Sequence, residues 1–188
     1  MLMDKYLPHY DFREIHTVQT NSSSRAVFQA LRGLTPTDLP LVRTLMAIRS
    51  VPSLLSGGAS FRSDANTPIL DQIIGSGFLF LGETKDEFLL GIIGKFWRPA
   101  GGLCPDILTA EGFKKFEDPG WAKAAWNFRV EGEGIDRRIQ TETRIVCTDG
   151  SARRKFRLYW WIVQPGSGMI RKSILNALQQ RAANNPEP

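Results

Sequence analysis

Few residues in this chain could carry acid–base chemistry, and they are scattered. Glu142 and Arg144 stand two positions apart and would therefore share one face of a β-strand, whereas His16 belongs to a separate segment near the start. The simplest interpretation of Glu142 with Arg144 is a structural ion pair on the outer side of a sheet. If that face pointed into a cavity, the desolvated carboxylate could act as a base with a perturbed pKa. A lone histidine on a terminal strand is more often structural.

No catalytic set accompanies these residues, because the sequence shows neither a nucleophile with its base nor paired carboxylates. The pattern favours a protein that is not an enzyme. An enzyme that uses Glu142, Arg144 or His16 is the alternative.

The cysteines and histidines do not suggest a metal site. Cys104 and Cys147 form no CxxC motif, and His9 and His16, the only histidines, both lie in the first segment. We therefore expect no metal and no cofactor. Both cysteines are predicted to be reduced, Cys104 in a loop and Cys147 in a strand.

Length and composition predict one globular domain over residues 1–183. With 188 residues the chain can bury one core, and 42% hydrophobic with 23% charged residues is ordinary for a folded domain. Residues 184–188 contain two prolines and no apolar residue, which predicts a disordered tail. Residues 1–5 mix acid and base where a signal peptide would be apolar, and the longest apolar stretch, residues 88–93, is too short to span a bilayer. A cytoplasmic location is expected.

Positive charge is concentrated in the last third of the chain. The net charge is +5, and from Val130 onward ten basic residues face six acidic ones, an excess of four. Arg153, Arg154, Lys155 and Arg157 would form a basic hairpin that could bind nucleic acid or acidic lipid. The solvated outer face of a sheet is favoured instead, because the neighbouring aromatic residues alternate as core residues do. Nucleic acid is thus not the expected partner, and an interaction or nucleic-acid module is kept as an alternative.

The C-terminal block predicts a strand followed by a helix. Apolar residues alternate over 156–163, which is typical of a core strand, and Asp149-Gly150 before it is a strong hairpin signal. Residues 164–167 contain Pro165 and Gly166 and predict a turn. A four-residue spacing of apolar residues then predicts a helix over 170–182.

The remaining elements follow from spacing and capping signals. Strands are predicted at 11–21, 78–81, 87–97, 126–131 and 139–148, and short helices after residues 21–24, after Thr35-Pro36 and after Thr67-Pro68. Loops are predicted over 49–66 and 98–120, the second with one helical turn at 109–116. Gly91 and Gly94 indicate either a bend in their strand or plain packing clearance.

This order of elements resembles the START-related helix-grip superfamily (SRPBCC), which includes pollen allergens, polyketide cyclases and lipid-transfer domains. The similar stretches are residues 77–83, 90–97, 141–144, 156–160 and 170–171. The resemblance implies an α+β fold in which a curved antiparallel sheet grips a long C-terminal α-helix, with two short helices after the first strand. The chain departs from it in having six readable strands instead of seven and in the insertion over 49–66.

The resemblance also implies a function: binding of a hydrophobic or amphipathic small molecule in a cavity between the sheet and the terminal helix, as carrier or sensor. A cyclase- or hydrolase-type enzyme of the same fold is the alternative. The expected ligand-binding residues are Phe78, Phe80, Phe88, Leu90, Ile92, Phe96, Trp126, Phe128, Thr141, Thr143, Phe156, Leu158, Trp160 and Ile174. Most are apolar, as in small-molecule sites generally, and the two threonines could orient a ligand. The alternative is that these side chains simply fill a core.

Three aromatic residues fall on the less apolar faces of their predicted strands. Trp97, Tyr159 and Trp161 would either be exposed and mark a homodimer or partner surface, or be covered by the 98–120 loop.

Overall fold

The computed structural model describes residues 1–39, 64, 66–98, 102–104, 107 and 109–184. The described strands are β1 (Phe12–Gln19), β2 (Leu79–Glu83), β3 (Glu87–Gly94), β4 (Ala122–Glu131) and β5 (Arg138–Cys147). The helices are α1 (Leu2–Tyr6), α2 (Ser24–Arg32), α4 (Ile69–Gly75), α5 (Ala110–Lys115) and α6 (Gly150–Asn184), with short 3₁₀ turns η1 (Pro36–Asp38) and η2 (Gly134–Asp136).

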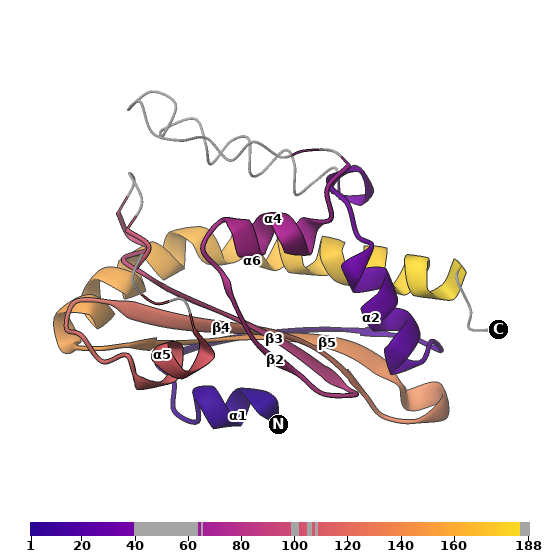
Figure 1. The fold of residues 1–188 in the computed structure, drawn as a ribbon, viewed down its shortest axis with the longest axis horizontal. Helices are drawn as coiled ribbons and strands as arrows, with labels where there is room; N and C mark the ends of the chain where they lie inside the picture. Colours follow the sequence, from indigo (N-terminus) through magenta and orange to yellow (C-terminus); the bar gives the residue numbers. More distant parts are fainter. Residues whose placement is uncertain (40–63, 65, 99–101, 105–106, 108, 185–188) are drawn as a thin grey trace.

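The strands form one antiparallel sheet in the order β1-β5-β4-β3-β2. Figure 1 shows this curved, open sheet as the middle layer, with α6, α2 and α4 on one side and α1 and α5 on the other. The predicted α+β fold is therefore confirmed: a curved antiparallel sheet carries a long C-terminal helix on one face.

The predicted last strand over 156–163 is wrong, and so are the hairpin at Asp149-Gly150 and the turn at 164–167. All of these residues from Gly150 onward belong to α6, which continues through Pro165 to Asn184. The predicted tail therefore begins inside α6 at Asn184, and residues 185–188 lie outside the described part.

Residues 156–163 form a helix and not a strand because their apolar side chains also fit a helical spacing. The Asp149 carboxylate accepts a hydrogen bond from the Ala152 backbone N–H at 2.8 Å, so Asp149 caps the helix instead of turning a hairpin. Ala152, Phe156, Ile174 and Leu178 are buried along one side of it. Pro165 lacks the N–H for one helical hydrogen bond and its ring crowds the preceding turn, at a cost of about 3 kcal/mol, yet the 35-residue helix continues through it.

The other capping signals predicted their helices correctly. The Ser23 side chain caps α2 and Thr109 caps α5, and Thr35 with Asp38 forms a capping box at η1. The helix predicted after Thr67-Pro68 is α4. The continuation of the second short helix beyond Leu39 and nearly all of the 49–66 loop lie outside the described residues.

Gly91 provides packing clearance and not a bend. The β3–β4 register runs through Gly91 and Gly94 without interruption. A Cβ on Gly91 would lie 2.7 Å from Leu81 Cδ1 and 2.9 Å from Phe113 Cε2, so α5 and β2 fit closely only because the side chain is absent. The irregularity in the ladder is in β2, between Phe80 and Gly82.

Both faces of the sheet are covered. On the α6 face, Leu90 and Phe128 join residues of α2 and α6 in one core. On the other face, Leu89 and Ile93 pack with α1 and α5 in a second core. The prediction that this outer face is exposed to solvent is therefore wrong. Asn127 on β4 is completely buried on this face.

Both cysteines are free, as predicted. Cys147 lies in β5, where burial raises the pKa of its thiol to about 12. No helix among the described residues has both the length and the apolar character needed to cross a membrane.

Candidate functional site

A largely buried polar cluster lies between the sheet and α6. It consists of Glu14 and His16 on β1, Thr143 on β5 and Arg171 on α6. Glu14 Oε1 lies 2.8 Å from His16 Nε2, and Arg171 donates a hydrogen bond to Thr143 Oγ1 at 2.6 Å. Arg171 Nη1 is 3.7 Å from Glu14 Oε2, so the guanidinium and the carboxylate form an ion pair in the interior.

The pairing of the strands brings the residues of this cluster together. Pairing of β3, β4, β5 and β1 places four side chains in one row: Leu90, Trp126, Thr143 and Glu14. The next row contains Phe88, Phe128, Thr141 and His16. An apolar surface therefore continues directly into the polar groups at the β1 edge.

Helix α6 approaches β1 closely at a residue without a side chain. A Cβ on Gly168 would lie 3.1 Å from Glu14 Oε1 and 3.4 Å from His16 Cε1. One turn further, the guanidinium of Arg171 lies over the Trp126 ring at 5.7 Å and donates to Ser167 Oγ. The backbone of α6 thus covers the carboxylate while its arginine reaches across to β5 and β4.

Two atoms of the cluster are unsatisfied. Glu14 Oε2 and Arg171 Nε are buried and have no hydrogen-bond partner among the described residues. Burial lowers the pKa of Arg171, and the charge of Glu14 offsets part of that effect. Burying a polar atom without a hydrogen-bond partner costs free energy. An unpaired acceptor beside an unpaired donor therefore marks a place where a further polar group would be stabilised.

Most of the predicted ligand-binding residues lie near this cluster, but not all. Trp126, Phe128, Thr141 and Thr143 are on the α6 face of β4 and β5, and Trp126 Nε1 donates to Thr141 Oγ1 at 2.6 Å. Four more of the predicted residues belong to the core on this face: Phe78, Phe88, Leu90 and Ile174. Ile92 is also buried on β3.

Four of the predicted residues lie elsewhere, and a fifth, Phe80, lies at the edge of the same row, where it pairs with Leu90. Phe96, Phe156 and Trp160 form a separate aromatic cluster with Phe12 where α6 begins. Phe80 is half-exposed, and Leu158 is exposed because it points outward from a helix instead of inward from a strand.

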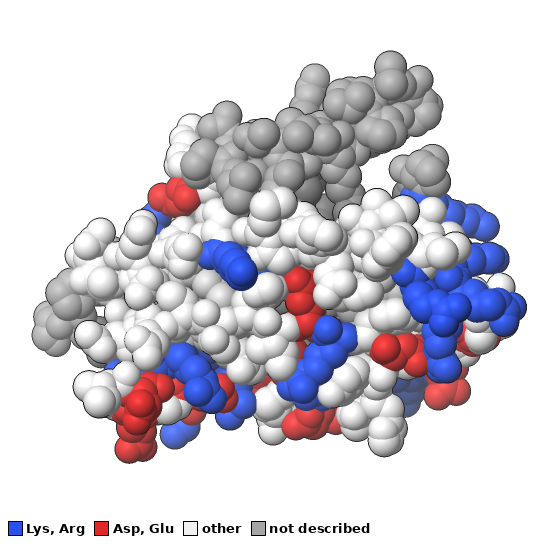
Figure 2. Space-filling model, turned by 180° about the vertical axis from the view of Figure 1, so that it is seen from behind, with Lys and Arg blue, Asp and Glu red and all other residues white. Residues whose placement is uncertain are grey.

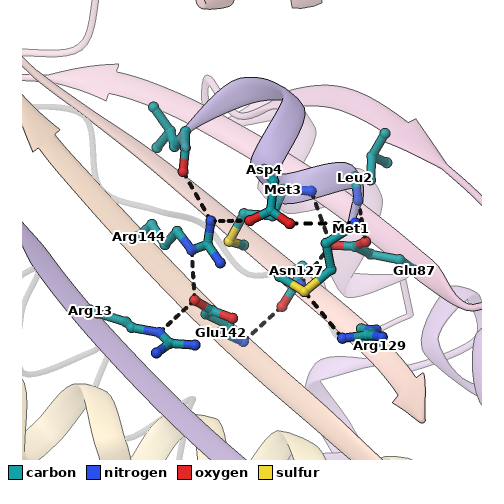
Figure 3. A network of polar contacts seen from close by, with 11 residues as sticks. Met1, Leu2, Met3, Asp4, Arg13, Glu87, Asn127, Arg129, Glu142 and Arg144 are labelled. Atoms are coloured by element: carbon teal, nitrogen blue, oxygen red, sulfur yellow. Dashed lines mark hydrogen bonds and ion pairs between the residues drawn. The ribbon is translucent and has the colours of Figure 1, made fainter. Parts of the chain in front are cut away.

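Glu142 and Arg144 are on the opposite face of the sheet, under α1 (Figure 3). Glu142 Oε1 accepts hydrogen bonds at 2.7 Å from both Arg144 and Arg13, and Arg144 donates to Asp4 at 2.6 Å. Burial lowers the pKa of Arg144, but the hydrogen bonds to Glu142 and Asp4 outweigh it and raise the pKa above its ordinary value. The two residues form an ion pair on the face of the sheet away from α6, as the simplest interpretation predicted, but the pair is buried and not solvated.

The same network fixes the start of α1. Glu87 is buried and accepts hydrogen bonds from the backbone N–H groups of Leu2 at 2.6 Å and Met3 at 3.2 Å. Asn127 donates to Glu87 at 2.8 Å and accepts from the Glu142 backbone at 2.8 Å. A carboxylate at a helix N-terminus is stabilising, so these groups serve to dock α1.

Two surface hollows lie away from the cluster. One, of about 570 Å³, is lined by residues such as Gln19, Ser22 and Gln179, and the other, of about 320 Å³, by residues such as Leu2 and Arg129. Neither is lined by a predicted ligand-binding residue. Within the described part of the chain, no group of three or more His, Cys, Asp or Glu side chains could hold a metal ion.

Sequence reasoning named His16 and Thr143 but not Glu14 or Arg171. Glu14 carried a signal, since it shares the predicted strand face with His16. For Arg171, the position beside Ile170 and Ile174 on the helix gives no indication that the side chain is largely buried.

The fold and the site define an α+β protein whose buried polar cluster is enclosed between an antiparallel sheet and a terminal helix. No protein-family model matches the chain, and no curated protein or solved structure matches it.

Proposed function

We propose that the protein binds an amphipathic small molecule between the sheet and α6 and acts as its carrier or sensor, as the resemblance to the START-related helix-grip superfamily implies. The observation that supports this most is the buried pair of unsatisfied atoms, Glu14 Oε2 and Arg171 Nε. They lie where the helix-grip fold would hold a ligand.

The chemistry of these two atoms defines the polar end of the ligand. Glu14 Oε2 can only accept a hydrogen bond and Arg171 Nε can only donate one. Glu14 and Arg171 already balance each other's charge, so a neutral group that both donates and accepts fits best. A hydroxyl or a primary amide meets this requirement, whereas an ether lacks the donor.

The apolar end of the ligand would lie along the rows of the sheet that lead away from the cluster. Trp126 adjoins Arg171, and Phe78 contacts Trp126 with ring centroids 6.4 Å apart. Leu90 continues the same row on β3. Leu90 is fully buried and the backbone of α6 covers Glu14 at Gly168, so we expect ligand entry to require displacement of α6 or of the neighbouring α4.

A matched series of probes tests this function. The full chain is titrated calorimetrically with a medium-chain fatty alcohol, the primary amide of equal length and the methyl ether of the alcohol. The alcohol and the amide are expected to bind at least about 10-fold more tightly than the ether, because a hydrogen bond to a charged group contributes roughly 1.5–3 kcal/mol. Equal affinities for all three, or no binding of any, would contradict the proposal.

One observation favours an acid–base enzyme as a second candidate. The Glu14 carboxylate holds the His16 imidazole at 2.8 Å, an arrangement that can orient a general base. Recovery of the bound alcohol unchanged after long incubation supports the carrier. A chemically altered product that disappears in His16→Gln would support the enzyme.

A further inference from the structure

The outer side of α6 carries an exposed apolar strip. Trp161 is 82% exposed, Ile162 76% and Leu158 69%, and Met169 is also exposed. Trp161 and Ile162 follow Leu158 by three and four residues, and Met169 follows Ile162 by seven, so all four lie on one side of the helix, opposite the buried Phe156 and Ile174. Large apolar side chains gathered in this way indicate an interaction surface.

Basic residues border this strip at both ends. Arg154, Lys155 and Arg157 precede it and Lys172 follows it, and all four are exposed. None of them forms an ion pair with another described residue, whereas Arg153 pairs with Asp11. Figure 2 shows Lys and Arg gathered at the end of the molecule where α6 begins. Over its 35 residues α6 contains seven basic side chains and no acidic one.

We propose that this side of α6, defined by Leu158, Trp161, Ile162 and Met169 with their basic borders, docks onto an anionic lipid surface. A helix that presents tryptophan and aliphatic side chains between lysines and arginines is suited to the interface of an acidic membrane. The basic side chains are attracted to the headgroups, and the apolar strip enters the boundary of the acyl chains. This inference rests on the outer side of α6 and is independent of the proposed ligand.

Co-sedimentation with vesicles tests the proposal. The full chain is expected to sediment with vesicles of mixed phosphatidylserine and phosphatidylcholine and to remain in solution with phosphatidylcholine alone. Trp161→Ser with Ile162→Ser is expected to abolish sedimentation. Arg154→Gln with Arg157→Gln should weaken it roughly 30-fold, because each basic residue near an acidic surface contributes about 1 kcal/mol. Added salt should weaken it further.

A control variant separates docking from net charge. Arg32→Gln with Arg138→Gln removes the same charge from elements outside α6 and should leave sedimentation unchanged. Equal weakening by both double variants would overturn the proposal, as would failure of the unmodified protein to bind acidic vesicles. Self-association through Trp161, or retention on duplex DNA through Arg154 and Arg157, in the absence of vesicle binding would also overturn it. Unchanged melting temperatures show that the variants fold.

Discussion

Arg171→Met is expected to weaken binding of the fatty alcohol by about 10- to 100-fold, because it removes a charged hydrogen-bond donor from a buried site. Methionine retains much of the apolar stem that packs beside Trp126, so the loss should be specific to the polar end of the ligand. The alcohol and its methyl ether both carry an oxygen that accepts from Arg171 Nε, so the variant should weaken both by a similar factor and keep the preference for the alcohol, which depends on donation to Glu14 Oε2. Titration calorimetry measures both values.

Arg181→Met is the matched control for this prediction. Arg181 is on the same helix, and its ion pair with Asp38 at 2.9 Å is at the surface. Its removal should not change either affinity. If Arg171→Met binds the alcohol as tightly as the unmodified chain does, Arg171 is not the anchor and the proposed polar end of the ligand is wrong.

The second large effect is on stability. Arg144→Met should lower the free energy of unfolding by about 3–5 kcal/mol, because it leaves the fully buried Glu142 with only the exposed Arg13 as a charged partner. Loss of the hydrogen bonds from Arg144 to Asp4 and to the Leu7 carbonyl should also release α1. Urea unfolding followed by circular dichroism measures the change.

Arg138→Met provides the comparison on the same strand. Arg138 pairs with Glu131 at 2.7 Å, but more than half of its side chain is exposed, so its loss should change stability by less than about 1 kcal/mol. Changing both Glu142 and Arg144 to methionine should recover much of the stability that Arg144→Met loses, because no buried carboxylate then remains unpaired. Equal losses for Arg144→Met and Arg138→Met would show that burial of the pair has no energetic consequence.

The sequence predicted the elements whose signals are local. The cap at Ser23 and the capping box at Thr35 each depend on neighbouring residues, and each was interpreted correctly. The segment 156–163 was not, because its residues are apolar at both two-residue and helical spacing. Packing of α6 against the sheet determines whether this segment forms a helix or a strand.

The candidate site was predictable in part. Alternation placed Trp126, Phe128, Thr141 and Thr143 on one face, and the structure has them on the side of α6. The burial of Arg171 depends on contacts with residues 28 and 157 positions away, which no local pattern contains. The covering of the opposite face by α1 is likewise a long-range contact, through Glu87.

Photolabelling would test the central claim most directly. The claim is that the ligand lies between the sheet and α6 with its polar end at Glu14 and Arg171. A fatty alcohol with a diazirine near its hydroxyl should label Trp126 or those side chains of residues 170–174 that face the sheet. An excess of unlabelled alcohol should reduce this labelling. Label confined to the outer side of α6 at Leu158 and Trp161, or spread without competition, would contradict it.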